Sequence, residues 1–274
     1  MASEVVDWCL LKDRLEALYR RYNKRELVHP DPLVFLYEYR EPRDREVVGL
    51  IASSLAYGRV QQILKSVAWV LDRLGPAPAD FLVSATPHEL ERLVEGFRHR
   101  FTSQEEMASL LKGIGGMIRR WGSLYQGFLS GVKKGDETLA PALARFVSLL
   151  AQEGGGRPSS LLPDPARGSA CKRLHLFLRW MVRKDAVDPG GWEELGAHRL
   201  IVPLDTHMHA ISLGLGLTKS RQADLKTALE VTRAFARVNP RDPVKYDFAL
   251  TRWGIREELT VGGLLRELED IKGD

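Results

Sequence analysis

Apolar residues recur at helical spacing along almost the whole chain, and no run of alternating β-branched residues lies between tight hairpin turns. Leu11, Leu15 and Leu18, for example, follow Trp8 on one face of an amphipathic helix, and Val47 begins a second such series. Because each amphipathic helix buries its apolar face against another element, a chain built only of such segments folds as packed helices. The sequence therefore predicts an all-α fold.

Capping and breaking residues mark the expected helix boundaries. Ser103 and Glu106 have the spacing of a capping box before an apolar series, although Gly113, Gly115 and Gly116 weaken the helix that should follow. Further helix starts are predicted at Ser169, at Asp205 and at Asp242 with Pro243, and a helix end is predicted at Gly75.

The clearest change in composition is the segment 153–168, which reads EGGGRPSSLLPDPARG. Its glycine and proline content is incompatible with a continuous helix. The sequence predicts a linker or a functional loop here, followed by a helix that carries Leu174, Phe177, Leu178 and Met181 on one face.

Composition narrows the class of protein. Forty Lys and Arg residues against 36 Asp and Glu give a net charge of +4, which is compatible with nucleic-acid binding but far from histone-like charge density. The two cysteines, Cys9 and Cys171, are too few for a disulfide framework, a structural zinc cluster or a four-thiolate iron–sulfur site. We expect a cytoplasmic protein, because no signal peptide or apolar stretch of membrane-spanning length occurs in the sequence.

Lys172 and Asp205 occupy positions that suit catalysis. Lys172 lies in the first turn of the helix predicted after the loop, where the positive end of the helix dipole, reinforced by Arg173, disfavours its ammonium form. Asp205 opens the next predicted helix, whose backbone N–H groups favour its anion. An amine nucleophile with a fixed carboxylate suits attack on the anomeric carbon of a sugar. The alternative is a surface lysine and a helix-capping aspartate without a joint role.

The residues around this pair resemble those of the helix-hairpin-helix superfamily of DNA glycosylases. Members have a hairpin, a lysine at the head of a helix and then a V-D-T-H-type segment whose aspartate opens the next helix. Leu162-Pro163 and Gly168-Ser-Ala-Cys-Lys172 are similar to the hairpin and lysine, and Leu204-Asp-Thr-His207 is similar to the aspartate segment. The stretches 51–62 and 245–254 resemble an early helix and turn and a late helix, so the resemblance covers about residues 45–255.

A closer resemblance is to an uncharacterised bacterial family known only as a domain of unknown function. It rests on CKRLHLFLRWMVR at 171–183 and PLDTHMHAISLGLGLT at 203–218. Lys172 and Asp205 are 33 positions apart, a long separation that is similar to the archaeal 8-oxoguanine DNA glycosylases. The resemblance therefore favours an oxidised purine as the excised base.

The resemblance implies a single two-lobed unit over residues 1–274. Its lobes would comprise residues 45–152 and 170–255, with 153–169 as the hairpin between them and 1–44 returning to pack on the C-terminal lobe. The implied activity is DNA base excision with abasic-site lyase chemistry, in which Lys172 forms a Schiff base and Asp205 stabilises the cationic transition state. No cofactor is implied, the partner is damaged or double-stranded DNA, and a monomer associated with the nucleoid is expected.

The same resemblance suggests further site residues. A basic stripe of Lys172, Arg179 and Arg183 lies at helical spacing and would neutralise phosphates, unless it is simply a solvated helix face. Predicted DNA contacts are Tyr57, Arg59, Gln61, Arg167, Gly168, Ser169, Arg173, Arg179 and His207, and the predicted base pocket comprises Trp180, Phe248 and Trp253, with Trp192 as a further candidate. Packing in the core is the alternative for these aromatic residues.

Two other functions fit parts of the sequence. The first is a helix-hairpin-helix module that binds DNA or a protein without chemistry. The second is a metal-dependent hydrolase, because Asp205-Thr-His-Met-His209 fits a D-x-H-x-H metal signature. However, no histidine follows His209, and residues two apart on a helix point to different faces, so we predict no metal site. Cys171 lies on the apolar side of its helix and is predicted to be a buried structural thiol.

Overall fold

The computed structural model describes residues 6–156, 159–255, 262–264 and 266, and within these ranges it contains helices but no β-strand. The all-α prediction is therefore confirmed. None of the helices in these ranges combines the length and apolar composition needed to cross a bilayer. The α-helices are α1 (Trp8–Tyr22), α2 (Pro42–Ser54), α3 (Val60–Leu74), α4 (Pro78–Ser84), α5 (Pro87–Leu93), α6 (Gln104–Trp121), α7 (Leu124–Leu129), α8 (Ala140–Glu153), α9 (Lys172–Val182), α10 (Thr206–Gly214), α11 (Leu225–Val238) and α12 (Asp247–Ile255). Short 3₁₀ helices are η1 (Arg25–Leu27), η2 (Pro32–Glu38), η3 (Pro165–Arg167), η4 (Glu193–Leu195) and η5 (Ala197–Arg199).

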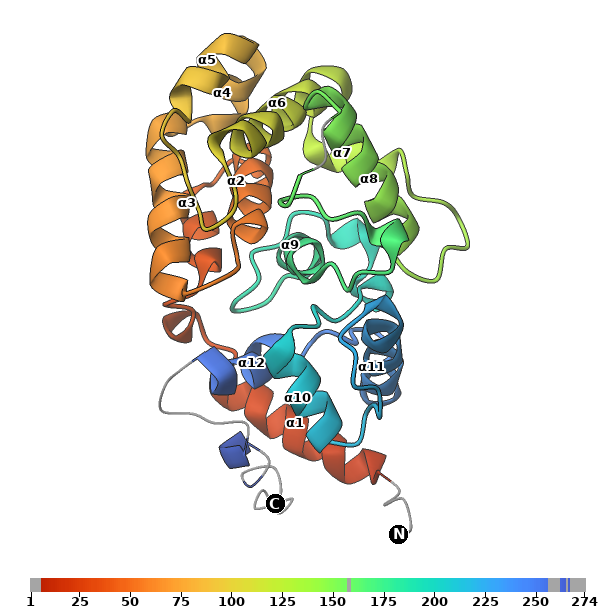
Figure 1. Cartoon of the computed structure of the whole chain (residues 1–274). Coiled ribbons are helices and arrows are strands. Elements are labelled where there is room, and N and C mark those ends of the chain that lie inside the picture. Colours follow the sequence, from red (N-terminus) through yellow and green to blue (C-terminus); the bar gives the residue numbers. More distant parts are fainter. Residues whose placement is uncertain (1–5, 157–158, 256–261, 265, 267–274) are drawn as a thin grey trace.

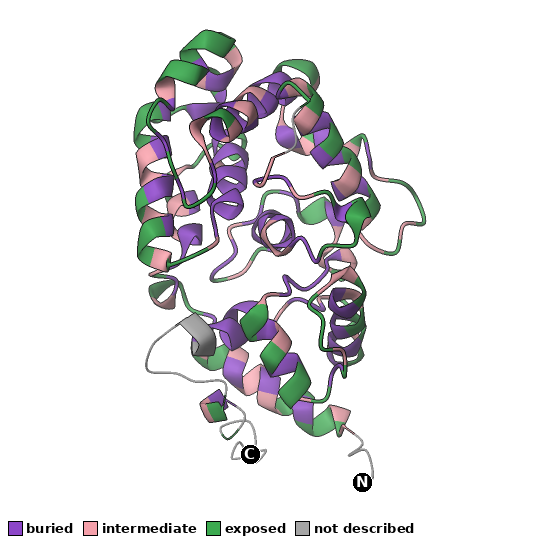
Figure 2. Ribbon diagram, in the orientation of Figure 1, coloured by how far each residue is buried: buried purple, intermediate pink, exposed green. Residues whose placement is uncertain are grey.

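The helices form two groups with α9 between them (Figure 1). The first group comprises α2–α8, in which α6 packs against α4, α5, α7 and α8. The second comprises α1, α10, α11 and α12, in which α1 packs on α11 and α12, and α10 packs on α12. The first 44 residues contribute to both groups. Helix α1 belongs to the second group, whereas η2 packs on α2 and α3 of the first group. Helix α9 packs on α2 and is buried along most of its length (Figure 2).

The glycines of α6 are explained by close helix packing. The predicted capping box is present, since Ser103 and Glu106 exchange side-chain and backbone hydrogen bonds at the start of α6. A Cβ atom on Gly113 would lie 2.5 Å from the carbonyl oxygen of Leu150 in α8, and one on Gly115 would lie 2.4 Å from the carbonyl oxygen of Leu82 in α4. The glycines thus weaken the helix locally but allow its neighbours to approach its backbone.

Two predicted helix starts are wrong. The N-cap of helix α9 is Cys171 and not Ser169, whose hydroxyl instead accepts a hydrogen bond from the Cys171 N–H just before the helix. Helix α12 begins at Asp247, because residues 243–246 form turns and the Asp242 carboxylate accepts hydrogen bonds from Arg183 instead of capping a helix. A tertiary ion pair has replaced the local capping interaction that the sequence favours. The predicted helix end at Gly75 is confirmed.

One of the buried carboxylates, Glu46, is held by hydrogen bonds from neutral groups. Glu46 of α2 is 4% exposed and accepts hydrogen bonds from the Trp192 indole at 3.1 Å and the Tyr125 backbone N–H at 3.2 Å. Burial raises the pKa of Glu46 to about 7, and these two hydrogen bonds offset only part of that rise.

Glu46→Gln is expected to remove part of the pH dependence of stability. In the native protein Glu46 holds its proton up to about pH 7, whereas in the unfolded chain it loses it near the ordinary value of 4.5. The free energy of unfolding should therefore fall by about 3 kcal/mol as pH rises through this window. Urea unfolding between pH 4.5 and 8 should give a shallower slope for Glu46→Gln than for the parent and for the surface control Glu95→Gln. Parallel slopes for all three proteins would contradict this expectation.

Candidate functional site

Lys172 and Asp205 face each other at the beginnings of two helices. Lys172 is the first residue of α9, and Asp205 is the N-cap of α10. The Lys172 Nζ atom lies 3.6 Å from Asp205 Oδ2, and the side chains are 31% and 23% exposed. The other carboxylate oxygen, Oδ1, accepts the Met208 N–H at 2.8 Å. One oxygen thus fixes the side chain, while the other is directed to the amine.

The loop before α9 sets the direction of Lys172. Gly168 and Cys171 both adopt left-handed backbone conformations, which turn the chain twice before the helix begins. The Gly168 carbonyl accepts the Leu225 N–H at 3.0 Å, so the loop is also attached to the start of α11. Cys171 is buried as predicted, and burial raises the pKa of its thiol. A thiol in this state is a structural group and not an activated nucleophile.

The Lys172–Asp205 pair opens into a cavity of about 610 Å³. The lining comes from both helix groups and from the loop before α9, and comprises Pro30, Asp31, Pro32, Ala56, Tyr57, Gly58, Val60, Ile63, Pro163, Ser169, Ala170, Cys171, Lys172, Arg173, Leu176, Leu204, Asp205, Thr206, His207 and Ala223. The volume suits one small organic group, and the lining combines aliphatic walls with a few polar side chains.

Tyr57 occupies the turn between α2 and α3 and lines this cavity. Its hydroxyl donates to the His99 carbonyl at 2.8 Å and lies 2.6 Å from Thr102 Oγ1. Its ring stacks on Phe101, with centroids 5.0 Å apart. Phe101 is 65% exposed, so the stack ends in an aromatic face open to solvent.

Sequence reasoning missed Phe101. The residue lies in a tight turn between α5 and α6, in which His99 and Thr102 exchange backbone hydrogen bonds and Arg100 adopts a positive φ of 55°. Gly58 has a φ of +95°, which a residue with a side chain rarely adopts, so a glycine is favoured where the two turns meet. The sequence feature that could have indicated Phe101 is an aromatic residue next to Arg98 and Arg100 that belongs to no helical pattern of apolar residues.

Arg173 lines the cavity, but its guanidinium is used within the protein. It donates to the Ser54 carbonyl at 2.6 Å and to the Ser160 carbonyl, and it lies 4.8 Å from the centre of the Tyr57 ring. Burial lowers its pKa. Arg173 therefore joins α2 to the segment before α9 and packs against Tyr57. Because these hydrogen bonds occupy the guanidinium, they disfavour direct contact with a phosphate.

The other predicted DNA contacts divide into two sets. Ser169 and His207 line the cavity together with Lys172. Arg59, Gln61, Arg167 and Gly168 are exposed but lie outside its lining. The Arg167 side chain is 84% exposed, and its nearest carboxylate, Asp164, is 3.7 Å away.

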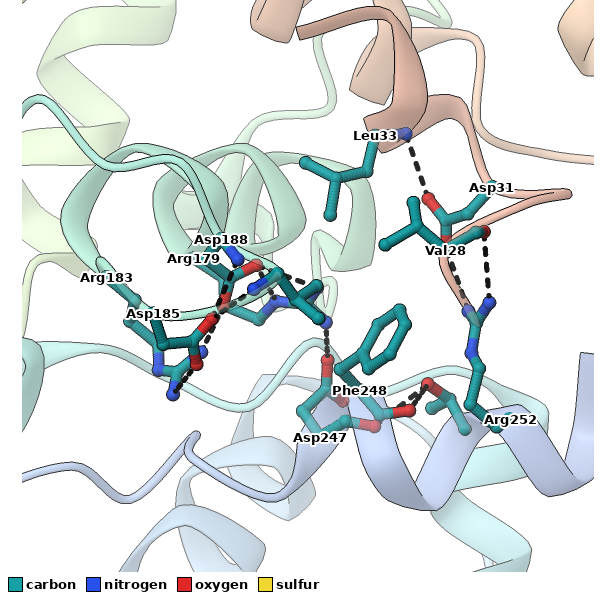
Figure 3. Close-up of polar contacts among 12 residues, drawn as sticks. Val28, Asp31, Leu33, Arg179, Arg183, Asp185, Asp188, Asp247, Phe248 and Arg252 are labelled. Atoms are coloured by element: carbon teal, nitrogen blue, oxygen red, sulfur yellow. Dashed lines mark hydrogen bonds and ion pairs between the residues drawn. The ribbon is translucent and has the colours of Figure 1, made fainter. Parts of the chain in front are cut away.

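The predicted basic stripe along α9 is wrong beyond Lys172. Arg179 is 2% exposed and donates to Asp188 and to Asp247, and Arg183 is 4% exposed and pairs with Asp185 and Asp188 (Figure 3). Arg183 also pairs with Asp242. The loop after α9 and the start of α12 cover this end of the helix. Arg179 is therefore an internal ion-pair partner and not a DNA contact.

The predicted aromatic base pocket is also wrong for three of its residues. Trp180, Phe248 and Trp192 are each at most 1% exposed, and none of them lines the cavity. Phe248 instead packs beneath the guanidinium of Arg252, whose Cζ is 4.2 Å from the ring centre. The side chain of Trp253 lies outside the described residues. Trp180, Trp192 and Phe248 therefore fill the core, as the alternative prediction stated.

The D-x-H-x-H segment shows no metal-ligand geometry. Within the described ranges no three His, Cys, Asp or Glu side chains converge as ligands would. His209 Nε2 lies 2.8 Å from the Ser220 carbonyl oxygen, and Asp205 faces Lys172.

The fold and site define an all-helical protein with a lysine–aspartate pair in a cavity between two helix groups. The sequence profile described as "Protein of unknown function (DUF2400)" matches residues 31–256, and the chain belongs to this family. Comparison with curated proteins and with solved structures gave no match.

Arg179→Met is expected to destabilise the protein strongly. The substitution leaves Asp188 and Asp247, both buried, without the guanidinium that they share. Removing one partner of a buried ion pair costs about 3–5 kcal/mol. Urea unfolding at pH 7 should show this loss, whereas the exposed control Arg167→Met should match the parent. Equal stability of both variants would mean that the buried pairs contribute nothing.

Proposed function

We propose that this protein is a DNA glycosylase with abasic-site lyase activity. The observation that carries the proposal is the 3.6 Å approach of Lys172 Nζ to Asp205 Oδ2 at two converging helix starts, with both groups open to the cavity. The two helix groups on either side of α9 would correspond to the two lobes of a helix-hairpin-helix glycosylase. A damaged base, with an oxidised purine as the first candidate, would occupy the cavity after leaving the duplex.

The chemistry assigns a separate task to each residue. The Asp205 carboxylate stabilises the positive charge that develops on the sugar as the glycosidic bond breaks and the base leaves with its electron pair. The Lys172 amine attacks the anomeric carbon, and the proton that Nζ loses as the C–N bond forms passes to Asp205 and from there to the departing base. The sugar ring then opens to a Schiff base on Lys172, and its ring oxygen takes up a proton. In the β-elimination a base removes a proton from C2′, the electron pair forms a double bond to C3′, and the C3′–O bond breaks so that the 3′ phosphate leaves with its electron pair. Hydrolysis releases Lys172.

The Tyr57–Phe101 stack supports DNA as the substrate. A nucleotide that leaves the duplex creates a gap in the stack of bases, and an exposed aromatic side chain fills such a gap favourably. The Tyr57 ring stacks on the Phe101 ring, and Arg98 and Arg100 lie just before Phe101 in the sequence. The positive charges of these arginines suit nearby phosphates. We propose damaged duplex DNA in the cytoplasm as the partner and a monomer as the active form.

Borohydride trapping on duplexes with 8-oxoguanine, uracil, hypoxanthine or an abasic site tests the proposal. The parent protein should form a covalent adduct, Lys172→Gln should form none, and Asp205→Asn should lower the trapping rate by about 100-fold or more. Lys226→Gln is a matched control, because Lys226 also lies in the first turn of a helix capped by an aspartate, Asp224, but outside the cavity.

The outcomes separate the candidate functions. An adduct that persists in Lys172→Gln would refute the assignment of the nucleophile. DNA binding by the parent without an adduct or base release on any substrate would favour the non-catalytic DNA-binding module.

Phe101→Ala is expected to weaken catalysis on duplex DNA without affecting stability. Stacking on a base is worth about 1–3 kcal/mol, so kcat/KM for an abasic-site duplex should fall about 10- to 100-fold. Leu213→Ala is the control, because Leu213 is an exposed apolar side chain of α10 that does not line the cavity. A loss of equal size on a flexible single strand, where no gap has to be filled, would argue against this role.

A further inference from the structure

We propose that Asp31 selects the base, by accepting hydrogen bonds from a purine edge that presents two adjacent N–H donors. This edge is the one that guanine and its oxidised forms carry at N1 and N2. The inference rests on the proposed function and assigns a substrate class within it.

Asp31 lines the same cavity as the Lys172–Asp205 pair, although it is distant from both residues in the sequence. Residues 28–31 connect η1 to η2, and the cavity is lined by Pro30 and Asp31 of this connection and by Pro32, the first residue of η2. The Asp31 side chain is 11% exposed, and its neighbours on the wall, Pro30 and Pro32, have no backbone N–H to offer a ligand. Asp31 is thus a polar residue between two prolines in this stretch of the lining, and its side chain is not completely buried.

The Asp31 carboxylate is held rigidly from outside the cavity. Oδ1 accepts the Leu33 N–H at 3.0 Å, and Oδ2 accepts from Arg252 Nη2 at 2.8 Å (Figure 3). Arg252 is 1% exposed and is itself fixed, because its Nη1 donates to the carbonyl groups of Leu27 and Val28 at 3.4 Å. Both carboxylate oxygens of Asp31 therefore act as hydrogen-bond acceptors, one for a backbone N–H and one for a guanidinium.

The number of acceptor positions determines the ligand class. An ionised carboxylate accepts about four hydrogen bonds, of which Leu33 and Arg252 use one on each oxygen. One position on each oxygen remains for a donor pair, and two parallel N–H groups bind a carboxylate in the bidentate manner of a guanidinium. A base edge that presents a carbonyl oxygen to Asp31 would place this acceptor against a carboxylate oxygen with no hydrogen-bonding proton between them, which is unfavourable.

Two oxidised purines that differ in one donor test the inference. 8-Oxoguanine carries the N2 amino group, and 8-oxohypoxanthine lacks it. Base release by the parent should be about 10-fold or more faster for 8-oxoguanine. Asp31→Asn should lower release of 8-oxoguanine about 100-fold and remove most of the preference. Trapping on an abasic-site duplex, which places no base in the cavity, should stay within about threefold of the parent.

Two further variants guard against a folding defect. Asp31→Glu keeps the charge that Arg252 requires but moves the carboxylate along the side chain, so it should fold, trap abasic sites and release 8-oxoguanine slowly. Asp44→Asn is the matched control, because Asp44 is a buried carboxylate that accepts the Ala79 N–H at 2.8 Å outside this cavity. It should match the parent in every assay.

The results distinguish this inference from the proposed function. Equal release of the two bases by the parent, or unchanged preference in Asp31→Asn and Asp31→Glu, overturns the role of Asp31 while leaving the lysine chemistry intact. Equal loss of base release and of abasic-site trapping in both variants also overturns it, since that pattern indicates a structural role. No adduct with the parent on any DNA overturns the proposed function, and this inference with it.

Discussion

Arg179 connects three parts of the molecule, and the geometry of the candidate site depends on it. Its guanidinium lies between Asp188, in the loop after α9, and Asp247, at the start of α12. Such buried charges are costly to remove from water, so each needs partners that are held in place. Helix α9 begins with Lys172, and α12 packs on α10, which begins after Asp205. The ion pairs that fix α9 against α12 thereby fix the two helix starts relative to each other.

The two helix starts differ in what they do to their charged residues. The first N–H groups of a helix have no partner one turn earlier within the helix, so a helix start favours an anion and disfavours a cation. Asp205 benefits from this and uses one oxygen for the Met208 N–H. Lys172 is held at an unfavourable end and relies on the second oxygen of Asp205. The pair therefore keeps an amine close to a proton acceptor in a partly exposed cavity, which is the arrangement that nucleophilic attack by an amine requires.

Local signals predicted much of the fold and the central pair, but not the surroundings of the pair. The capping box of α6 and the Asp205 cap depend on neighbours within four residues, so the sequence contains them in full. The helical periodicity of α9 predicted that Arg179 lies on the same face as Lys172. It could not predict which end of that face other parts of the protein bury. Tertiary packing covers Arg179 and leaves Lys172 open. Asp31 and Phe101 were missed for the same reason, since their neighbours Arg252 and Tyr57 are distant in sequence.

Under the proposed function, the loop before α9 would contact DNA differently from a glycine-rich hairpin that offers backbone N–H groups to a phosphate. Pro163 and Pro165 have no N–H group. The N–H groups of Ala166, Arg167 and Gly168 are already bound to Asp164 or to the Pro165 carbonyl. The Arg167 side chain is an exposed cation in the described part of this loop. Phosphate binding here would thus depend on a flexible side-chain charge in place of a rigid backbone cradle, which makes the attraction longer in range, lower in geometric selectivity and more sensitive to salt.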